Sequence, residues 1–165
     1  MPGFEIIGKE EKLELNSIFK KGSVLFRHGF DIKRKGSYKV KQFENNFKNK
    51  FRSKYSLAVT SGTSALRVAL ATLDLKKDDE VITQAFTFVA TVEAIVESQA
   101  KPIITEIDET LNMDPNDLFK KITKKTKAVI VVHMLGVPAD LSKIKRICDT
   151  KNITLIEDTA WGCGG

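Results

Sequence analysis

Residues 128–133, Ala-Val-Ile-Val-Val-His, are the strongest indication of the fold in this sequence. Its unbroken apolar run, with no polar residue at alternate positions, predicts a strand that is buried on both faces. Such strands are typical of parallel sheets that helices cover on both sides. A helical pattern at Asp140–Thr150 and a second strand pattern at Ile153–Glu157 follow along the chain. This strand–helix–strand order predicts a right-handed crossover between two parallel strands.

The same alternation begins upstream, near residue 56. Further strands are expected at Ser56–Thr60, Glu80–Thr83 and Pro102–Glu106, and further helices at Thr63–Leu73, Thr87–Glu97 and Asp114–Lys121. The repeated order predicts an α/β fold, in which a parallel sheet forms the middle layer of an α/β/α sandwich. The printed chain ends shortly after the last of these strands, where a helix ordinarily follows. We therefore expect a domain that is truncated before its last strands.

Residues 1–52 have a different pattern, because they are polar, basic and poor in strand signals. Apolar residues recur at helical spacing in Lys9–Phe19 and in Tyr38–Phe51, and a loop bounded by glycines, Gly22–Phe30, lies between them. We expect an N-terminal helical segment with a loop at residues 1–52, followed by the α/β domain at residues 53–165.

Composition excludes several classes of protein. The chain has 165 residues, of which 42% are hydrophobic and 29% charged, so it is neither low-complexity nor disordered. Cys148 and Cys163 are too few for a disulfide scaffold and lack metal-ligand spacing, so we expect no metal site and a cytoplasmic protein with reduced thiols. The net charge of +6 comes from dispersed lysines, without interleaved aromatic residues. We expect neither a nucleic-acid partner nor a membrane partner.

Ligands of open parallel sheets bind outside the carboxyl ends of the strands, so the residues that follow each strand are the candidates. Ser61-Gly62-Thr63-Ser64 follows the first expected strand and opens a helix. A glycine, hydroxyl groups and the free N–H groups of a helix N-terminus together favour an anion, most naturally a phosphate. Taken alone, the turn is more simply explained as an ordinary Ser/Thr N-cap.

Two further strand ends carry candidate ligand-binding residues. Phe86 and Phe88 follow the second expected strand and could cover a planar ligand, although core packing is the alternative and is preferred for Phe86. Glu157 and Asp158 end the last strand, where a carboxylate needs a positive partner or serves as a cap. A phosphate, a planar ring and a cationic ring nitrogen together describe pyridoxal 5′-phosphate (PLP).

Motifs along almost the whole chain resemble the PLP-dependent sugar aminotransferases of the DegT/StrS family, which have fold type I. The motifs are Ser61–Leu66, Asp79–Ile82, Phe86–Thr91, Ile107-Asp108 with Asp114, Thr126–His133 with Gly136 and Pro138–Asp140, and Ile156–Asp158. The resemblance implies the large, PLP-binding domain of such an enzyme.

The resemblance also implies roles for individual residues. Gly62, Thr63 and Ser64 would hold the PLP phosphate, Phe88 would stack on the pyridine ring, and Asp158 would pair with the protonated ring nitrogen. Trp161 stands where the family usually has a glutamine near the ring hydroxyl. An indole N–H can donate a hydrogen bond but cannot accept one, so the contact with the ring hydroxyl must differ.

The family's Schiff-base lysine would lie beyond Gly165, as would the small C-terminal domain, so no catalytic residue is assigned and the chain alone is expected to be inactive. The resemblance implies that the full-length parent, a homodimer, transfers an amino group, with glutamate as donor, to a keto-sugar that is usually nucleotide-linked. The pathway would be amino-sugar or cell-surface polysaccharide biosynthesis, such as that of lipopolysaccharide. The alternatives are a non-catalytic fragment or binding module that retains the fold, and a PLP sugar dehydratase in which histidine replaces the lysine.

Overall fold

The structure, a computed structural model, describes residues 6–164. These residues form two compact units, one that ends at Ala58 and one that begins at Val59. None of the helices in this part of the chain is long and apolar enough to cross a membrane.

The N-terminal unit contains helices α1 (Lys9–Lys20), α2 (Asp31–Arg34) and α3 (Lys39–Lys50). The helical spacing predicted α1 and α3, but the short helix α2 was not expected. Arg34 explains the turn before α2, because its buried guanidinium donates to the backbone carbonyls of Gly29 at 2.6 Å and His28 at 3.2 Å. The loop is thus held by the side chain of Arg34, at the end of α2, and by the rings of Phe26 and Phe30, whose centroids lie 5.6 Å apart.

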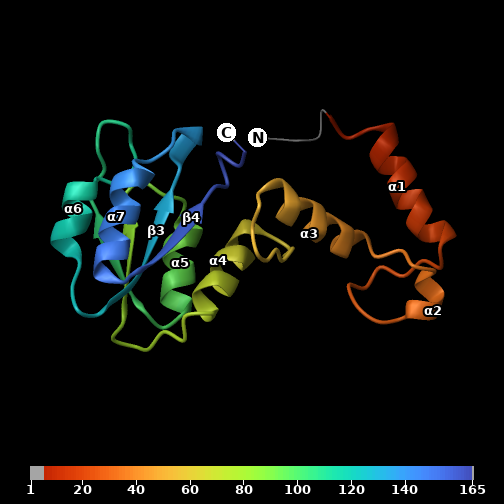
Figure 1. Ribbon diagram of the computed structural model, residues 1–165, viewed down its shortest axis with the longest axis horizontal. Helices are drawn as coiled ribbons and strands as arrows, with labels where there is room; N and C mark the ends of the chain where they lie inside the picture. The colour runs from red at the N-terminus through yellow and green to blue at the C-terminus, as the bar shows by residue number, and fades with distance from the viewer. Residues whose placement is uncertain (1–5, 165) are drawn as a thin grey trace. The chain divides into compact units, whose positions relative to one another are not determined.

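The second unit is built on a four-stranded sheet whose order is β2-β1-β3-β4. Figure 1 labels the neighbouring strands β3 and β4. The strands are β1 (Glu80–Gln84), β2 (Lys101–Thr105), β3 (Thr126–Val132) and β4 (Thr154–Asp158). Every neighbouring pair is parallel, as the crossover pattern predicted. The apolar run at residues 128–132 therefore lies in an interior strand.

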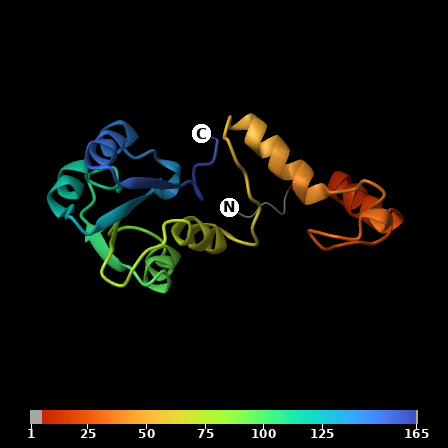
Figure 2. The same cartoon turned by 60° about the horizontal axis from the view of Figure 1, so that its bottom comes forward.

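Helices cover both faces of this sheet, which gives the predicted α/β/α sandwich (Figures 1 and 2). Helices α4 (Gly62–Ala71) and α5 (Val89–Glu97) pack on one face, and α6 (Pro115–Lys121) and α7 (Leu141–Lys151) on the other.

Alternate residues of β3 belong to different cores. Ile130 and Val132 pack against α4 and α5, whereas Val129 and Val131 pack against α6 and α7. This alternation follows from the two-residue period of a strand and explains why the run carries no polar position.

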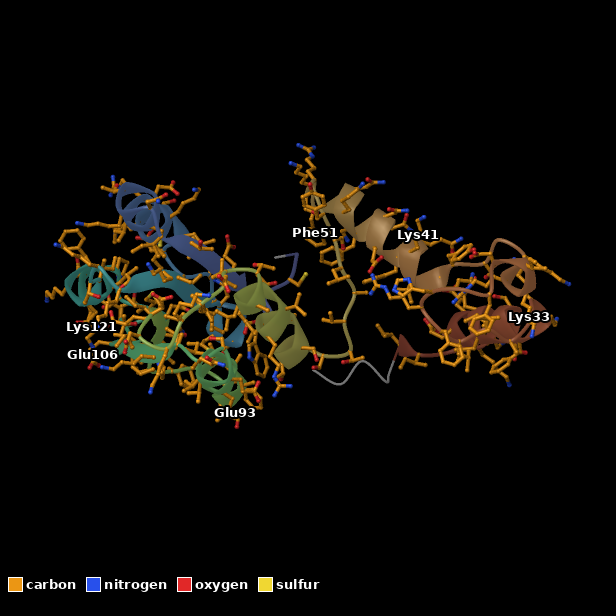
Figure 3. All side chains as sticks on the ribbon, turned by 90° about the horizontal axis from the view of Figure 1, so that it is seen from below. Lys33, Lys41, Phe51, Glu93, Glu106 and Lys121 are labelled. Atoms are coloured by element: carbon orange, nitrogen blue, oxygen red, sulfur yellow. The ribbon has the colours of Figure 1, made fainter. Side chains whose placement is uncertain are left out.

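Helix α6 is attached to the end of β2 by polar contacts. Figure 3 labels Glu106 and Lys121 from this part of the chain. Asp114 is its N-cap and Pro115 its first residue, as predicted. The Asp117 carboxylate accepts the backbone N–H of Glu106 at 2.8 Å and forms an ion pair with Lys121 at 3.0 Å. The backbone N–H bond, together with Lys121, lowers the pKa of Asp117 below its ordinary value.

The expected strand at Ser56–Thr60 does not form. The segment has no strand partner among the described residues and is half-buried or exposed. A strand is stabilised by hydrogen bonds to a neighbour, whereas here the backbone of Ala58 bonds instead to the side chains of Arg27 and Glu44. The residue pattern of a strand was present, but none of the strands that the structure describes pairs with this segment.

Candidate functional site

The candidate site lies at the carboxyl ends of the strands, on the face covered by α4 and α5. Helix α4 leads by a short loop to the start of β1, so it runs back along the sheet and its N-terminus lies at the carboxyl edge (Figure 1). Ile156 packs in the core below α4 and α5. Because alternate residues of a strand share a face, Asp158 at the end of β4 is directed to the same side as α4.

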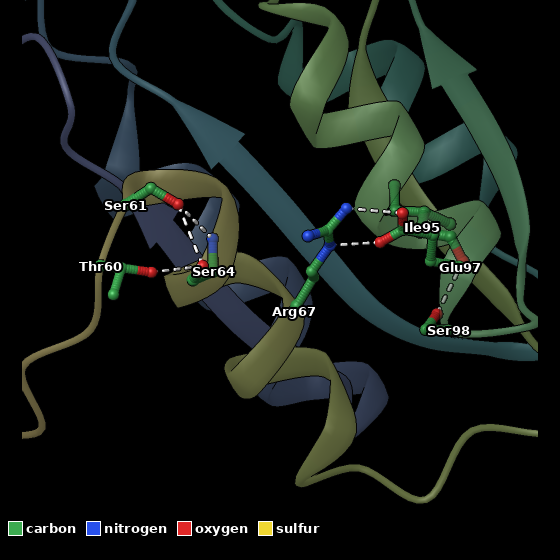
Figure 4. Close-up of polar contacts among 7 residues, drawn as sticks. All are labelled: Thr60, Ser61, Ser64, Arg67, Ile95, Glu97 and Ser98. Atoms are coloured by element: carbon green, nitrogen blue, oxygen red, sulfur yellow. Dashed lines mark hydrogen bonds and ion pairs between the residues drawn. The ribbon is translucent and has the colours of Figure 1, made fainter.

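Three hydroxyl groups gather at the N-terminus of α4 (Figure 4). Ser61 is the N-cap, and its Oγ accepts the backbone N–H of Ser64 at 3.1 Å. The Ser64 Oγ lies 3.0 Å from the Ser61 Oγ and 3.3 Å from the Thr60 Oγ1. The N-cap expected as the simpler explanation is therefore present.

The cap leaves room for an anion. It satisfies the N–H of Ser64, whereas Gly62 and Thr63 are the first two residues of α4, and the N–H groups of such residues have no acceptor within the helix. A Cβ placed on Gly62 would meet nothing within 4 Å, so the backbone here is open to an incoming group. Free N–H groups, hydroxyls and the positive end of the helix dipole fit a phosphate.

An ion pair fixes α4 beside α5. The Arg67 guanidinium of α4 donates hydrogen bonds from two nitrogens to the Glu97 carboxylate of α5, one of them at 2.6 Å (Figure 4). Bidentate geometry of this kind restricts rotation as well as distance. The helix that carries the hydroxyl cluster is thereby held against the helix that Phe88 precedes.

Phe88 occupies the N-cap position of α5, and its side chain is 66% exposed, which argues against core packing. Phe86, which was expected in the core, is 37% exposed, so that prediction was wrong. The loop between them is held by Gln84, which is fully buried at the end of β1. The Gln84 amide donates to the carbonyl of Phe86 at 3.0 Å and accepts the N–H of Val132 at 3.1 Å.

Asp158 and Glu157 face opposite sides of the sheet. The Asp158 Oδ1 accepts the N–H of Ala160 at 3.0 Å, so this carboxylate does cap the turn after β4. One oxygen is enough for the cap, and the partly buried carboxylate retains a second. Glu157 lies instead 3.7 Å from the Nε2 of His133, on the side of α6 and α7.

Trp161 lies in the turn after β4 and is 50% exposed. Its backbone carbonyl lies close to Gly136, in the short 3-10 turn Met134–Gly136 that follows β3. Every residue predicted to bind the cofactor is therefore at the carboxyl edge: Gly62, Thr63 and Ser64 at the start of α4, Phe88 at the start of α5, and Asp158 and Trp161 after β4.

Sequence reasoning missed three buried polar residues at this edge: Gln84, Asn112 and His133. Each of the three side chains accepts a backbone N–H. Gln84 accepts that of Val132, Asn112 that of Met134, and the Nδ1 of His133 that of Ala139 at 3.1 Å. Gln84 is the last residue of β1 and His133 directly follows the apolar run of β3, and these positions at strand ends could have identified both.

Known proteins resemble this chain in sequence and in fold. The sequence model of the DegT/DnrJ/EryC1/StrS aminotransferase family matches residues 24–165. GDP-perosamine synthase of Escherichia coli O157:H7 is 40% identical over 134 residues, which make up 81% of this chain and 36% of that protein. An aminotransferase from Psychrobacter cryohalolentis superimposes with a TM-score of 0.84 at 32% identity, covering 96% of this chain and 38% of that one.

A dehydratase has the same fold. GDP-4-keto-6-deoxy-D-mannose-3-dehydratase of E. coli, solved with bound hydrated PLP, has a TM-score of 0.78 at 31% identity, covering 92% of this chain and 38% of that one. The chain thus spans little more than a third of the length of these relatives. Because the family model covers most of the sequence and the structures share its parallel sheet, the chain belongs to the DegT/DnrJ/EryC1/StrS aminotransferase family.

Proposed function

We propose that the chain supplies the phosphate-binding and ring-binding elements of a PLP-dependent sugar aminotransferase. One observation carries the proposal: the hydroxyl-rich N-terminus of α4 and the Asp158 carboxylate lie at the same edge and on the same face of the sheet. A phosphate and a protonated ring nitrogen at the two ends of one small ligand require such an arrangement.

Each residue has a definite part in this proposal. The N–H groups of Gly62 and Thr63 and the hydroxyls of Thr63 and Ser64 bind the phosphate. Phe88 covers the ring, and its exposed side chain is free to do so. Asp158 accepts the ring N–H in a charge-assisted hydrogen bond. The bound cofactor supplies the electron-withdrawing ring that amino transfer requires.

Trp161 distinguishes this site from the usual family pattern. Its indole N–H can donate to an oxygen on the ring but cannot accept a proton from it. A donor in that place favours the ionised form of a ring hydroxyl, because hydrogen bonds to the charged form stabilise it.

The substrates we propose are an amino-acid donor, glutamate, and a nucleotide-linked keto-sugar. The keto-sugar is supported by the likeness to a GDP-perosamine synthase and to a dehydratase of a GDP-linked keto-sugar. The same likeness supports a role in amino-sugar or cell-surface polysaccharide biosynthesis. We further propose that the enzyme works as a cytoplasmic homodimer.

A sugar dehydratase is the second candidate, because the dehydratase structure covers nearly the same part of the chain as the aminotransferase structure. Both candidates use the same cofactor-binding residues. The reaction would be distinguished by whether a lysine or a histidine faces the bound cofactor.

Calorimetric titration with pyridoxamine 5′-phosphate tests the cofactor site, because this amine cannot form a Schiff base with surface lysines. We expect it to bind much more tightly than pyridoxamine, which lacks the phosphate. Asp158→Asn should weaken binding about tenfold or more, the equivalent of losing a hydrogen bond to a charged group. The matched control is Asp149→Asn, which alters an exposed carboxylate of α7. Equal affinity for the two amines, or unchanged affinity in Asp158→Asn, would contradict the proposal.

A further inference from the structure

Asn112 is a completely buried polar residue that precedes α6. Its carboxamide bonds to two points of the turn that follows β3. The Oδ1 accepts the N–H of Met134 at 3.1 Å, and the Nδ2 donates to the carbonyl of Val137 at 3.2 Å. The Nδ2 also lies 3.1 Å from the Oγ1 of Thr110. One side chain therefore spans both ends of the turn Met134–Gly136.

Two backbone hydrogen bonds close this turn, from the N–H of Gly136 to His133 and from the N–H of Val137 to Met134, but its backbone conformation is strained. Leu135 has a φ of 55° and Gly136 a φ of 83°, both in the left-handed region. A non-glycine residue there costs conformational energy and persists only where its surroundings hold it in place. The two hydrogen bonds from Asn112 are such a restraint, because they fix the residues on either side of Leu135.

The segment that carries Trp161 rests on this turn. A Cβ placed on Gly136 would come within 3.3 Å of the Trp161 carbonyl oxygen. A Cβ placed on Gly162 would lie 3.9 Å from the Cα of Gly136 and 3.7 Å from the Cβ of His133. The two glycines thus let the two turns touch backbone to backbone, and a shift of one turn displaces the other.

We propose that Asn112 is a positioning residue that sets the place of Trp161 through the Met134–Gly136 turn. Its relevance to the cofactor rests on the function proposed above, in which Trp161 donates to the ring. Asn112 lies beneath the turn and acts only through it. Its amide is suited to this work because it donates and accepts at once, which neither a carboxylate nor a hydrocarbon side chain does.

Trp161 is the only tryptophan of the 165 residues, so its fluorescence reports its own position. We compare Asn112→Ala with Asn116→Ala, a matched control at an exposed position in the first turn of α6. Acrylamide quenching is measured well below the unfolding transition, with circular dichroism to verify folding. In Asn112→Ala we expect the emission of Trp161 to shift to the red and its quenching constant to rise. Because Trp161 is already 50% exposed, full exposure to solvent would at most double that constant. Asn116→Ala should match the unmodified chain.

A purely structural role for Asn112 would lower the unfolding midpoint and leave the quenching of the folded chain unchanged, and that result would overturn the proposal. If Asn112→Ala does not fold, hydrogen exchange in the unmodified chain tests whether the two turns are coupled. The amides of Met134 and Gly162 should then open together as denaturant is raised, and separate openings would contradict the coupling. Titration with pyridoxamine 5′-phosphate is run in parallel. A quenching change in a chain that binds no cofactor supports the link from Asn112 to Trp161 while contradicting the proposed function.

Discussion

The Glu44 side chain is hydrogen-bonded to the backbone of Ala58: its Oε1 accepts the N–H of Ala58 at 2.8 Å. Arg27, which is ion-paired with Glu44, donates to the carbonyl of Ala58 at 2.8 Å. The two side chains together occupy the donor and the acceptor that Ala58 would offer to a neighbouring strand. The segment that leads to α4 is thereby held in the N-terminal unit by side chains in place of a sheet.

We expect Glu44→Ala to release this segment. The half-buried N–H of Ala58 would lose its acceptor, at a cost of about 1–3 kcal/mol. Native-state hydrogen exchange at Ala58 should accelerate accordingly. Glu14→Ala is the control, since Glu14 also forms an ion pair but its side chain is 66% exposed. Equal exchange at Ala58 in both variants would show that the Glu44 contact contributes nothing.

The cap and the anion site at α4 should be separable by mutation. Ser61→Ala removes the N-cap bond and should destabilise the helix by about 0.5–2 kcal/mol. Thr63→Ala leaves the cap intact and should reduce the affinity for pyridoxamine 5′-phosphate with little change in stability. Thermal unfolding and calorimetric titration of both variants check this. A loss of stability with Thr63→Ala comparable to that with Ser61→Ala would show that the hydroxyls serve the helix alone.

Asp117 should make the stability of the α6–β2 contact depend on pH. Its pKa is lowered in the folded chain, first by the backbone N–H of Glu106 and then by Lys121. A lowered pKa stabilises the fold above the ordinary carboxyl pKa of about 4, and this contribution is lost as the pH falls through the folded-state value. Denaturant unfolding from pH 7 to pH 2 measures the free energy of unfolding. This free energy should fall less with acid in Asp117→Asn than in the unmodified chain. An identical pH profile in the variant would refute the assignment.

The two cysteines should differ sharply in reactivity. Cys148 is a residue of α7 whose side chain is buried in the core, and burial raises the pKa of its thiol to about 11. The thiolate is the reactive form, so Cys148 should resist alkylation near pH 8, whereas the exposed Cys163 should react. Mass spectrometry after a short iodoacetamide pulse measures this, with a urea-unfolded sample in which both should react. Rapid labelling of Cys148 in the folded chain would show that the core opens readily.

The sequence was sufficient for those features that depend on residue period and on helix ends. The apolar run of β3, and Asp114 with Pro115 at the start of α6, are local patterns, and the structure confirms both. Ser56–Thr60 shows the limit, because a strand requires a partner that its own residues do not specify. Asn112 shows another limit: its role depends on Met134 and Val137, more than twenty residues away, which no local spacing could reveal.

The sheet has consequences for the behaviour of the molecule in solution. Among the described residues, β2 and β4 each pair with one strand only, so each leaves one side of its backbone open. An open edge can serve as a template for a further strand, from this chain or from another copy. At high concentration the isolated chain is therefore expected to polymerise edge to edge. Light scattering across a dilution series measures this, and scattering from monomers alone at every concentration would refute it.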